Sequence, residues 1–255
     1  MIANYHTHTP RCRHAHGSEE EYVQNALAAG LQILGFSDHT PYPFPDGYVS
    51  TFRMLPQELK SYVSSVLAMR KKYAGQIQIP LGVEAEFYPK YFADMVCMLR
   101  DQGIEYMLLG QHMLHNEVEG IGAGGPTADP SLLRQYCNQS IDAMYTGLFS
   151  YFAHPDLMCF VGDSTVYRRE ITRLCRAAND CGIPLEINLL GLRDGKRYPN
   201  PRFWEIAAEE GCTVILGRDA HHPQMLLESA VEQQALQLVS SLGLRLIEII
   251  SLQKI

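Results

Sequence analysis

The chain has 255 residues and a formal net charge of −7, and 46% of its residues are hydrophobic and 19% charged. This length suits one or two domains, and the apolar share excludes a disordered chain, a collagen and a coiled coil. The excess of acidic residues argues against broad, non-specific nucleic-acid binding, although bound cations would still allow a small anionic substrate.

The sequence contains no apolar run of about 18 residues, so it predicts no membrane span. Its first twelve residues have neither a basic segment nor an apolar segment of the kind found in secretory signals. The seven cysteines are scattered, odd in number and never spaced as CxxC. We therefore expect reduced thiols and a cytoplasmic protein.

Short apolar runs, which predict buried strands, alternate with longer amphipathic segments, which predict helices. The predicted strands span residues 1–5, 31–37, 77–84, 104–110, 148–153, 183–189, 212–217 and 244–250. The predicted helices span residues 18–29, 56–73, 89–101, 131–146, 165–180, 201–210 and 224–241. Ser18 and Glu21 form the pattern of a capping box at the first helix, and most of these segments end near a glycine.

Regular alternation of strands and helices favours a parallel sheet with right-handed crossovers. Seven or eight such units fit a closed barrel better than an open doubly wound sheet. No GxGxxG motif follows the first strand, which weakens a dinucleotide-binding alternative. We expect an α/β barrel formed by a single domain over residues 1–255.

Polar side chains follow the predicted strands at the point where each strand ends. Seven of the ten histidines lie at or shortly after such ends, together with two carboxylates. These residues are His6, His8, His14, His39, His112, His154 and His221, with Glu84 and Asp219. In a parallel barrel the carboxyl ends of all strands face the same side, so these side chains are expected to meet.

Such a cluster is costly without cations, because the carboxylates repel and buried imidazoles need partners. Imidazole nitrogen and carboxylate oxygen suit divalent Zn, Mn or Fe. Alternate side chains of an extended segment point the same way, so His6 and His8 can hold one ion. A single strand-end histidine is most often structural, but seven at matching positions favour a shared metal centre.

Several assignments stay open at this point. Glu84 and Glu86 alternate onto the same side of a strand, so the pattern does not choose between them. His14 competes with His16 as a ligand. Cys12 is interpreted as an ordinary loop thiol rather than a zinc ligand.

Six segments resemble the motifs of the polymerase-and-histidinol-phosphatase (PHP) superfamily of metal-dependent phosphoesterases. They are HTHTPRCRH (6–14), SDHTPYP (37–43), LGVEAEFYP (81–89), GQHM (110–113), AHPDL (153–157) and GRDAHHP (217–223). Within the superfamily the chain is similar to the monofunctional histidinol-phosphate phosphatases, through HTPxCxH and EINLLGLRDGKRYPNP followed by DAH. The resemblance covers nearly the whole chain.

The resemblance implies a distorted (β/α)7 barrel with three divalent metal ions at the carboxyl ends of its strands. The first ion would be held by His6, His8, Glu84 and Asp219, the second by Glu84, His112 and His154, and the third by His14, His39 and His221. Arg193 or Arg197 would help to bind the phosphate. Asp156 would serve either as an acid for the leaving group or as a residue that orients a ligand.

The implied reaction is hydrolysis of a small phosphate monoester, L-histidinol phosphate, by a hydroxide between the first two ions, as a step of histidine biosynthesis. Two segments depart from the family pattern. Residues 188–191 lack the usual Ser or Thr before the glycine, and the segment that follows Met113 has no clear counterpart. Both departures bear on the substrate more than on the metals.

Three other interpretations compete. The chain would be a PHP phosphoesterase for another substrate, such as a nucleotide or a sugar phosphate; an amidohydrolase-type barrel; or a metal-binding protein without activity. The amidohydrolase class usually carries a modified lysine after strand four, where this chain has Gly110-Gln111-His112. The full set of ligand types argues against an inactive protein. The sequence does not fix the oligomeric state.

Overall fold

The computed structural model describes residues 1–45 and 47–255. Strands and helices alternate along the chain, as predicted, and every strand pair is parallel. The strands are β1 (Ala3–Asn4), β2 (Ile33–Leu34), β3 (Phe36–His39), β4 (Leu81–Ala85), β5 (Tyr106–Leu109), β6 (Phe149–Phe152), β7 (Leu185–Asn188), β8 (Thr213–Gly217) and β9 (Arg245–Leu246).

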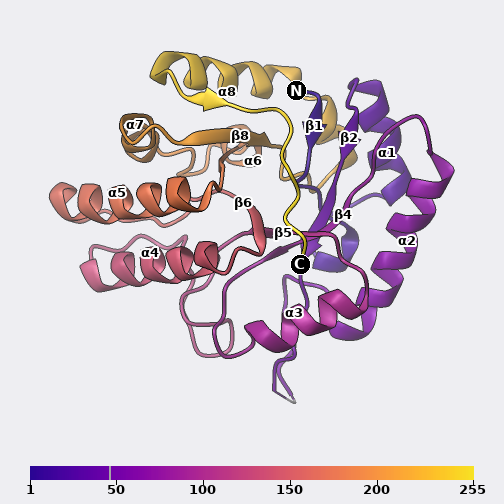
Figure 1. The fold of residues 1–255 in the computed structure, drawn as a ribbon, viewed down its shortest axis with the longest axis horizontal. Helices are drawn as coiled ribbons and strands as arrows, with labels where there is room; N and C mark the ends of the chain where they lie inside the picture. Colours follow the sequence, from indigo (N-terminus) through magenta and orange to yellow (C-terminus); the bar gives the residue numbers. More distant parts are fainter. Residues whose placement is uncertain (46) are drawn as a thin grey trace.

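The helices cover the outside of the strands (Figure 1). They are α1 (Glu19–Ala28), α2 (Leu59–Lys72), α3 (Phe92–Asp101), α4 (Pro130–Tyr145), α5 (Ser164–Cys181), α6 (Leu189–Arg193), α7 (Pro201–Glu209) and α8 (Ser229–Leu242), with short 3-10 turns at Pro10–Cys12, Pro56–Glu58 and Pro223–Leu227. The capping box of Ser18 and Glu21 is formed. The helix α6 was not predicted; Asn188 caps it by accepting a hydrogen bond from the Gly191 N–H (2.9 Å).

The strands form a distorted ring. One sheet has the order β3-β4-β5-β6-β7-β8-β9, and β1 pairs with β2 in a second. β2 and β3 are separated by Gly35 alone, and a single parallel bridge from Thr7 to Ala220 links the segment after β1 to the segment after β8. In the described part of the chain, the ring is therefore joined by a bridge rather than a full ladder between its first and last members.

The sequence predicted one strand over residues 31–37, and the structure divides it at Gly35. The hydroxyl of Tyr106 lies beside this glycine and donates to the carbonyl oxygens of Tyr5 (2.8 Å) and Phe36 (3.1 Å). A side chain at position 35 would collide with that hydroxyl. The break makes room for a tyrosine of β5, which reaches past Gly82 of β4.

Two apolar clusters follow from the alternation of side chains along the strands. The larger cluster lies between strands and helices and includes Met107 and Leu109 of β5. The smaller cluster fills the inside of the ring at its amino-terminal base. Its buried members are Ala3, Tyr5, Ile33, Tyr106, Leu108, Tyr151, Ala153, Ile215 and Ile250.

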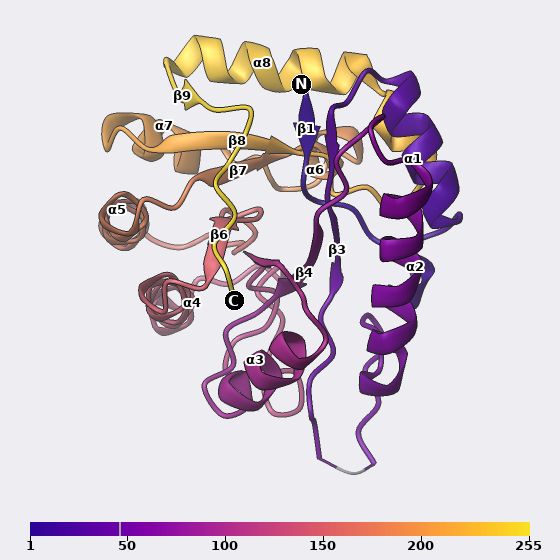
Figure 2. The ribbon, with the colours of Figure 1, turned by 45° about the vertical axis from the view of Figure 1, so that its right-hand side comes forward.

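The C-terminal segment closes the base of the ring. The sequence predicted a strand over residues 244–250, but β9 is limited to Arg245–Leu246, and the chain then leaves β8. Figures 1 and 2 show this segment, in yellow, crossing the strands on its way to the C-terminus. Ile250 joins the inner cluster, and the Gln253 N–H donates to Ser150 Oγ (3.0 Å).

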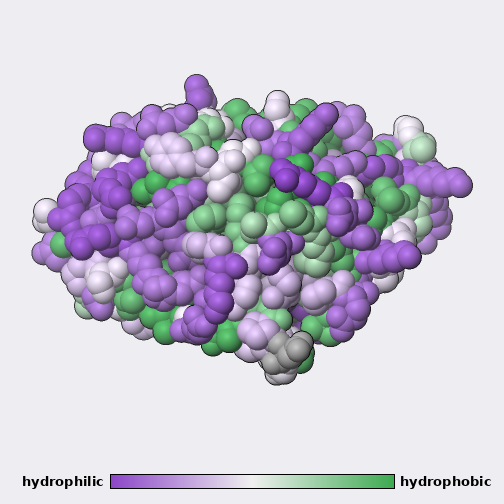
Figure 3. Space-filling view, turned by 60° about the horizontal axis from the view of Figure 1, so that its bottom comes forward, coloured by the Kyte–Doolittle hydropathy of each residue, from purple (hydrophilic) through white to green (hydrophobic). Residues whose placement is uncertain are grey.

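Among the described residues, no helix has the length and apolar character that a membrane crossing requires. On the face shown in Figure 3, hydrophobic side chains gather near the centre, and the surrounding surface is mostly hydrophilic.

Candidate metal centre

The structure brings all nine predicted ligands together at the carboxyl ends of the strands. β3 ends at His39, which is paired in register with Glu84 of β4. His154 lies two residues after β6, and Asp219 two residues after β8. Groups of His, Asp and Glu drawn from these residues have ligand atoms within 4.8 Å of one another. Residues far apart in sequence thus meet because parallel strands end on the same side of the ring.

Glu84 lies at the middle of the cluster and is 1% exposed. Five imidazoles surround its carboxylate: His154 Nε2 (2.8 Å) and His112 Nε2 (3.5 Å) beside Oε1, and His39 Nδ1 (3.1 Å), His6 Nε2 (3.5 Å) and His8 Nε2 (3.6 Å) beside Oε2. Gly110, after β5, leaves room for this side chain, because a Cβ there would overlap Glu84 Oε1. One carboxylate therefore faces two groups of histidines, one on each oxygen.

Asp219 is the second carboxylate of the centre. Its Oδ1 lies 3.1 Å from His8 Nε2, 3.5 Å from His6 Nε2 and 3.3 Å from His221 Nδ1. Its backbone has a φ of 48°, and His154 has a φ of 32°, in the region that non-glycine residues rarely adopt. Such strain is concentrated at functional sites, where the surrounding structure holds it in place.

His14, His39 and His221 form a third group at the more exposed edge of the centre. The Nε2 atoms of His14 and His221 are 2.9 Å apart. His16, the alternative to His14, instead stacks on His222 with ring centroids 4.6 Å apart. His14, and not His16, therefore lies with His39 and His221.

Hydrogen bonds at Nδ1 orient most of these rings. The pairs are His6 with Glu186 Oε2 (2.9 Å), His112 with Glu86 Oε1 (2.9 Å), His8 with Asp38 Oδ1 (3.4 Å), His14 with the Cys12 carbonyl (2.7 Å) and His221 with the Asp219 carbonyl (2.9 Å). Carboxylates and carbonyls only accept, so in the neutral form of each ring Nδ1 carries the proton, and Nε2 has the lone pair that can bind a metal.

Sequence reasoning missed Glu186, although it precedes Asn188 by two residues and so faces the same side of β7. The Asn188 side-chain amide donates to Glu186 Oε1 (2.7 Å) and to Asp219 Oδ2 (3.0 Å), which ties β7 to the metal centre. Gly217 of β8 provides the space for the Glu186 carboxylate. Alternation along the strand was the available signal.

The electrostatics of the centre reflect its dense packing of charge. Burial raises the pKa of Glu84 and of Asp219, but the nearby imidazoles outweigh it and hold both pKa values well below the usual range. Burial lowers the pKa of His6 and His8, yet neighbouring carboxylates, with Glu186 foremost at His6 and Asp219 at His8, raise both pKa values well above normal. Protons on His6 and His8 thus neutralise the carboxylates in the metal-free protein.

Two members of the third group, His39 and His221, have lowered pKa values instead. Burial holds the pKa of His39 well below its usual range, and burial together with His8 lowers the pKa of His221 to about 3. These two imidazoles are therefore neutral at pH 7, which is the form that binds metals.

Thirteen buried side-chain atoms of the described residues have no hydrogen-bond partner, and four of them meet at one place: His6 Nε2, His8 Nε2, His39 Nδ1 and Glu84 Oε2. Buried polar atoms are rarely left unpaired in native proteins. All four belong to the cluster around Glu84, and imidazole nitrogen with carboxylate oxygen is a donor set for divalent cations. The site is built to bind divalent metal.

A cavity of about 480 Å³ opens over the centre. Its wall contains ligand residues, Arg193, Asp194 and Lys196, and the apolar side chains of Phe52, Met113, Leu190, Tyr198 and Met225. Arg193, carried there by α6, donates from Nε to Glu228 Oε1 (3.0 Å). The cavity joins metal ligands to a positively charged edge.

Two predicted catalytic residues lie behind this wall. Arg197 is not among the described lining residues, and its Nη1 donates to Cys159 Sγ (2.7 Å). Asp156 is also outside the lining; its Oδ2 accepts from the Asn200 N–H (2.6 Å) and from Trp204 Nε1 (2.9 Å). Burial raises the pKa of Asp156 to about 6.

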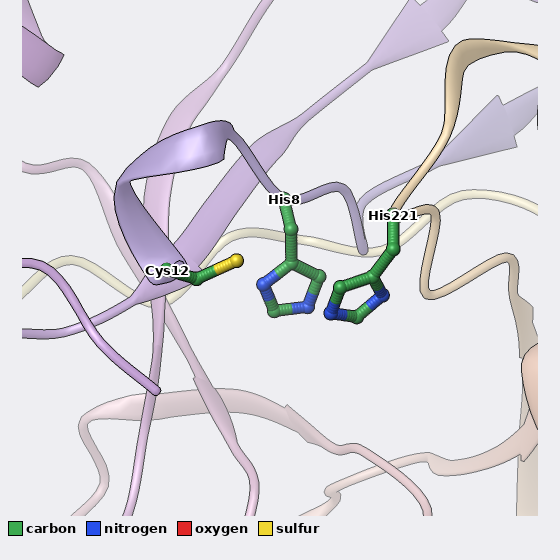
Figure 4. Close-up of side chains that lie close together, drawn as sticks. All are labelled: His8, Cys12 and His221. Atoms are coloured by element: carbon green, nitrogen blue, oxygen red, sulfur yellow. The ribbon is translucent and has the colours of Figure 1, made fainter. Parts of the chain in front are cut away.

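Cys12 lies beside the centre, although the sequence indicated an ordinary loop thiol. Its side chain is buried, and its Sγ is within 4.8 Å of ligand atoms of His8 and His221. Figure 4 shows the thiol pointing toward the His8 ring, which lies between Cys12 and His221. Burial raises the pKa of the thiol, but His14 and His8 outweigh it and lower that pKa.

Comparisons with known proteins agree with this geometry. A family model described as "PHP domain" matches residues 4–189. A probable histidinol-phosphatase from Deinococcus radiodurans is 31% identical over 241 residues, covering 87% of each chain, and the histidinol-phosphatase of Bacillus subtilis is 25% identical over 250 residues, covering 85% of this chain and 92% of that one.

Among solved structures, a histidinol phosphate phosphatase from Lactococcus lactis, in complex with zinc, L-histidinol and phosphate, has the same fold. The TM-score is 0.76 at 18% identity, over 99% of this chain and 98% of the other. The family match spans most of the chain, and the resemblance inferred from the six motifs is confirmed: this chain belongs to the PHP domain family.

Proposed function

We propose that this chain is a metal-dependent phosphatase that hydrolyses L-histidinol phosphate to L-histidinol and phosphate. The observation that carries the proposal is the position of Glu84, a buried carboxylate between two groups of imidazoles at the floor of a cavity with a cationic edge. Support for the substrate comes from the relatives, which are named histidinol-phosphatases and match this chain along nearly their full length.

The proposed centre holds three divalent ions, with zinc, manganese or iron as candidates. His6, His8, Glu84 and Asp219 would hold the first, Glu84, His112 and His154 the second, and His14, His39 and His221 the third. Bound ions of this kind lower the pKa of water and neutralise charge on phosphoryl oxygens. Glu84 would be shared, since its two oxygens face different histidines.

Arg193 is the proposed phosphate-binding arginine. It lines the cavity, and a planar guanidinium can bind two phosphoryl oxygens at once. Arg197 is engaged with Cys159 behind the wall, so its proposed role is to support the turn that precedes α7. Lys196 adds a second positive charge to the wall.

The contacts of Asp156 favour an orienting role over that of an acid. Its carboxylate holds the amide of Asn200 and the indole of Trp204, and so fixes the segment just after Tyr198. Tyr198 lines the cavity next to His154, with ring centroids 5.9 Å apart. In this proposal Asp156 shapes the pocket for the leaving group without contacting it.

A substrate panel tests the proposal directly. The protein loaded with zinc or manganese is assayed on L-histidinol phosphate, a nucleotide, a sugar phosphate and a phosphodiester. We expect kcat/KM for L-histidinol phosphate to exceed the others by at least about a hundredfold, because a site that hydrogen-bonds one leaving group rejects analogues that leave its polar groups unpaired. A higher kcat/KM for a nucleotide or a sugar phosphate would replace the proposed substrate.

Single substitutions test the assigned roles. Alanine at His112 or His154 is expected to remove most turnover and to leave the fold intact, whereas full activity would refute the shared position of Glu84. Arg193→Ala is expected to raise KM by roughly tenfold or more, through loss of a charge-assisted contact of about 1.5–3 kcal/mol. Arg197→Ala is the matched comparison and should change KM much less.

The cytoplasmic location predicted from the sequence belongs to the same proposal. It follows from the biosynthetic reaction proposed here and from the seven cysteines, each a free thiol in the described structure.

A further inference from the structure

We propose that Arg53 is a positioning residue of the metal centre, which acts through Glu86 to fix the ring of His112 and so sets the affinity for the ion that His112 would bind. The inference deepens the proposed function and rests on it for the metal ion that His112 would bind. Neither Arg53 nor this role for Glu86 was anticipated from the sequence.

Arg53 is 1% exposed and fully engaged by three segments of the chain. Its Nη1 and Nη2 donate to Glu86 Oε2 (3.1 Å) and Oε1 (3.0 Å), and its Nε donates to Glu117 Oε2 (2.6 Å). Nη1 also donates to the carbonyl of Thr40 (2.9 Å), the residue after ligand His39. One guanidinium thus joins the segments that carry His39, Glu84 and His112.

Glu86 passes this constraint to the metal centre. Its Oε1 accepts from Arg53 and from His112 Nδ1, the latter at 2.9 Å. A carboxylate is only an acceptor, so the proton of neutral His112 is held on Nδ1. The Nε2 lone pair is then directed at the cavity, 3.5 Å from Glu84 Oε1.

His112 needs such support more than its neighbours do. Its side chain is 23% exposed, whereas those of His6 and His8 are fully buried and that of His154 is 3% exposed. Of the five imidazoles around Glu84, the His112 ring is therefore the one that packing alone restrains least. Without the two hydrogen bonds from Arg53, the Glu86 carboxylate could rotate, and the His112 ring could rotate with it.

The same arginine also anchors a wall of the cavity. Its guanidinium lies 4.4 Å from the ring centroid of Phe52 and 5.1 Å from that of Tyr42. Phe52 lines the cavity and packs edge-on against His39 and His112. Position of the ligand and shape of the cavity thus depend on one buried side chain.

The test compares two arginines with the same geometry at opposite ends of the barrel. Arg53→Lys keeps the charge but loses the two-pronged contact. Arg70→Lys is the matched control, because Arg70 makes an equivalent contact with Glu105 (2.9 and 2.6 Å) at the surface near the base. Metal content and zinc affinity are measured on each purified protein, together with the ¹⁵N shifts of the His112 ring.

For Arg53→Lys we expect one metal site to weaken by about 10–100-fold, the range for loss of a group that orients a ligand. The other sites should keep wild-type affinity, and the ¹⁵N shifts should show a loss of the Nδ1–H form of His112. Arg70→Lys should match the wild type in both measurements. A folded Arg53→Lys protein with wild-type metal affinity and ring signature would overturn the proposal.

Glu86→Gln keeps the proposal testable if Arg53→Lys does not fold. The side-chain amide that this substitution introduces can donate to His112 Nδ1, which moves the ring proton to Nε2 and blocks the metal-binding atom. The same site should weaken at least as much, and an unchanged affinity would again overturn the proposal. Both readouts are independent of substrate, so they remain decisive if L-histidinol phosphate is not hydrolysed.

Discussion

The two ends of the barrel interior are filled in opposite ways. At the base, aliphatic and aromatic side chains form a buried cluster that the C-terminal segment covers with Ile250. At the carboxyl end, most of the imidazoles and both carboxylates are buried as well, and several of their polar atoms lack partners among the described residues. The apolar side chains of the base need no further partner, whereas the polar atoms at the carboxyl end need bound cations as partners.

Within one ring of strands, the base therefore stabilises the fold and the carboxyl end carries the chemistry. Burial of apolar surface needs no cofactor and stabilises the fold by about 25 cal/mol per Å². Burial of the metal ligands, in contrast, destabilises the fold as long as protons occupy the place of the metal, because buried charged and polar groups need partners. A groove of about 740 Å³ lies near the base, but its lining contains no histidine, so size alone does not identify the functional site.

The largest effect should follow from Glu84→Gln, which removes the shared charge of the carboxyl end and places an amide donor among imidazole nitrogens. We expect kcat/KM on L-histidinol phosphate to fall on the order of 10³-fold or more, because the amide disturbs two ions at once. Steady-state kinetics and metal analysis measure this. Glu105→Gln, near the base, is the control and should retain activity; a Glu84→Gln enzyme of near wild-type activity would contradict the assignment.

The second prediction concerns the pH dependence of zinc binding, which depends on the carboxyl end alone. The raised pKa values of His6 and His8 mean that zinc must displace protons at neutral pH. Apparent affinity should therefore fall as the pH is lowered from 8 to 6, by roughly tenfold per pH unit for each displaced proton. Calorimetry in buffers of different ionisation enthalpy counts these protons. Affinity independent of pH would show that the ligands are already deprotonated.

A substitution at the base should act on stability alone. Ile250→Ala opens the inner cluster and is expected to lower the free energy of unfolding by about 2–5 kcal/mol. Ile249→Ala is the control, because Ile249 is 51% exposed, and its effect should stay within about 0.5 kcal/mol. Urea unfolding gives both values. If Ile250→Ala instead lowered kcat without lowering stability, the two ends would not be independent.

Asp156→Asn is expected to have the smallest effect and to change the pH dependence of stability. Burial raises the folded-state pKa of Asp156 to about 6, from an ordinary value of 3.8. The carboxyl group therefore favours the folded state at low pH, and this contribution is lost as the pH rises from about 4 to about 6. Across that pH range, the free energy of unfolding of the variant should rise relative to that of the wild type by up to about 3 kcal/mol.

Unfolding of both proteins between pH 4 and pH 7, with metal removed, measures this difference, because the other titrating groups cancel in the comparison. Most of kcat should remain in Asp156→Asn, since the side chain lies behind the cavity wall. A large loss of kcat together with parallel stability curves would restore Asp156 as the acid.

Much of the fold and of the ligand set is predictable because it depends on local pattern. The sequence shows apolar runs of strand length that are separated by amphipathic segments. It also shows the polar residue at the end of each run. The break at Gly35 and the short β9 were missed because Tyr106 and the barrel base, which are distant in sequence, impose them.

The sequence by itself determined that parallel strands would end in imidazoles and carboxylates, because strand period and chain order place them there. Tertiary structure decided which carboxylate stands at the centre and which supports it: β4 ends at Ala85, so Glu84 faces the histidines while Glu86 turns toward Arg53. It likewise placed His14 rather than His16, and Arg193 rather than Arg197, in reach of the cavity. The physical reason is that distances of a few ångströms between segments far apart in sequence depend on how the chain packs, which no local pattern records.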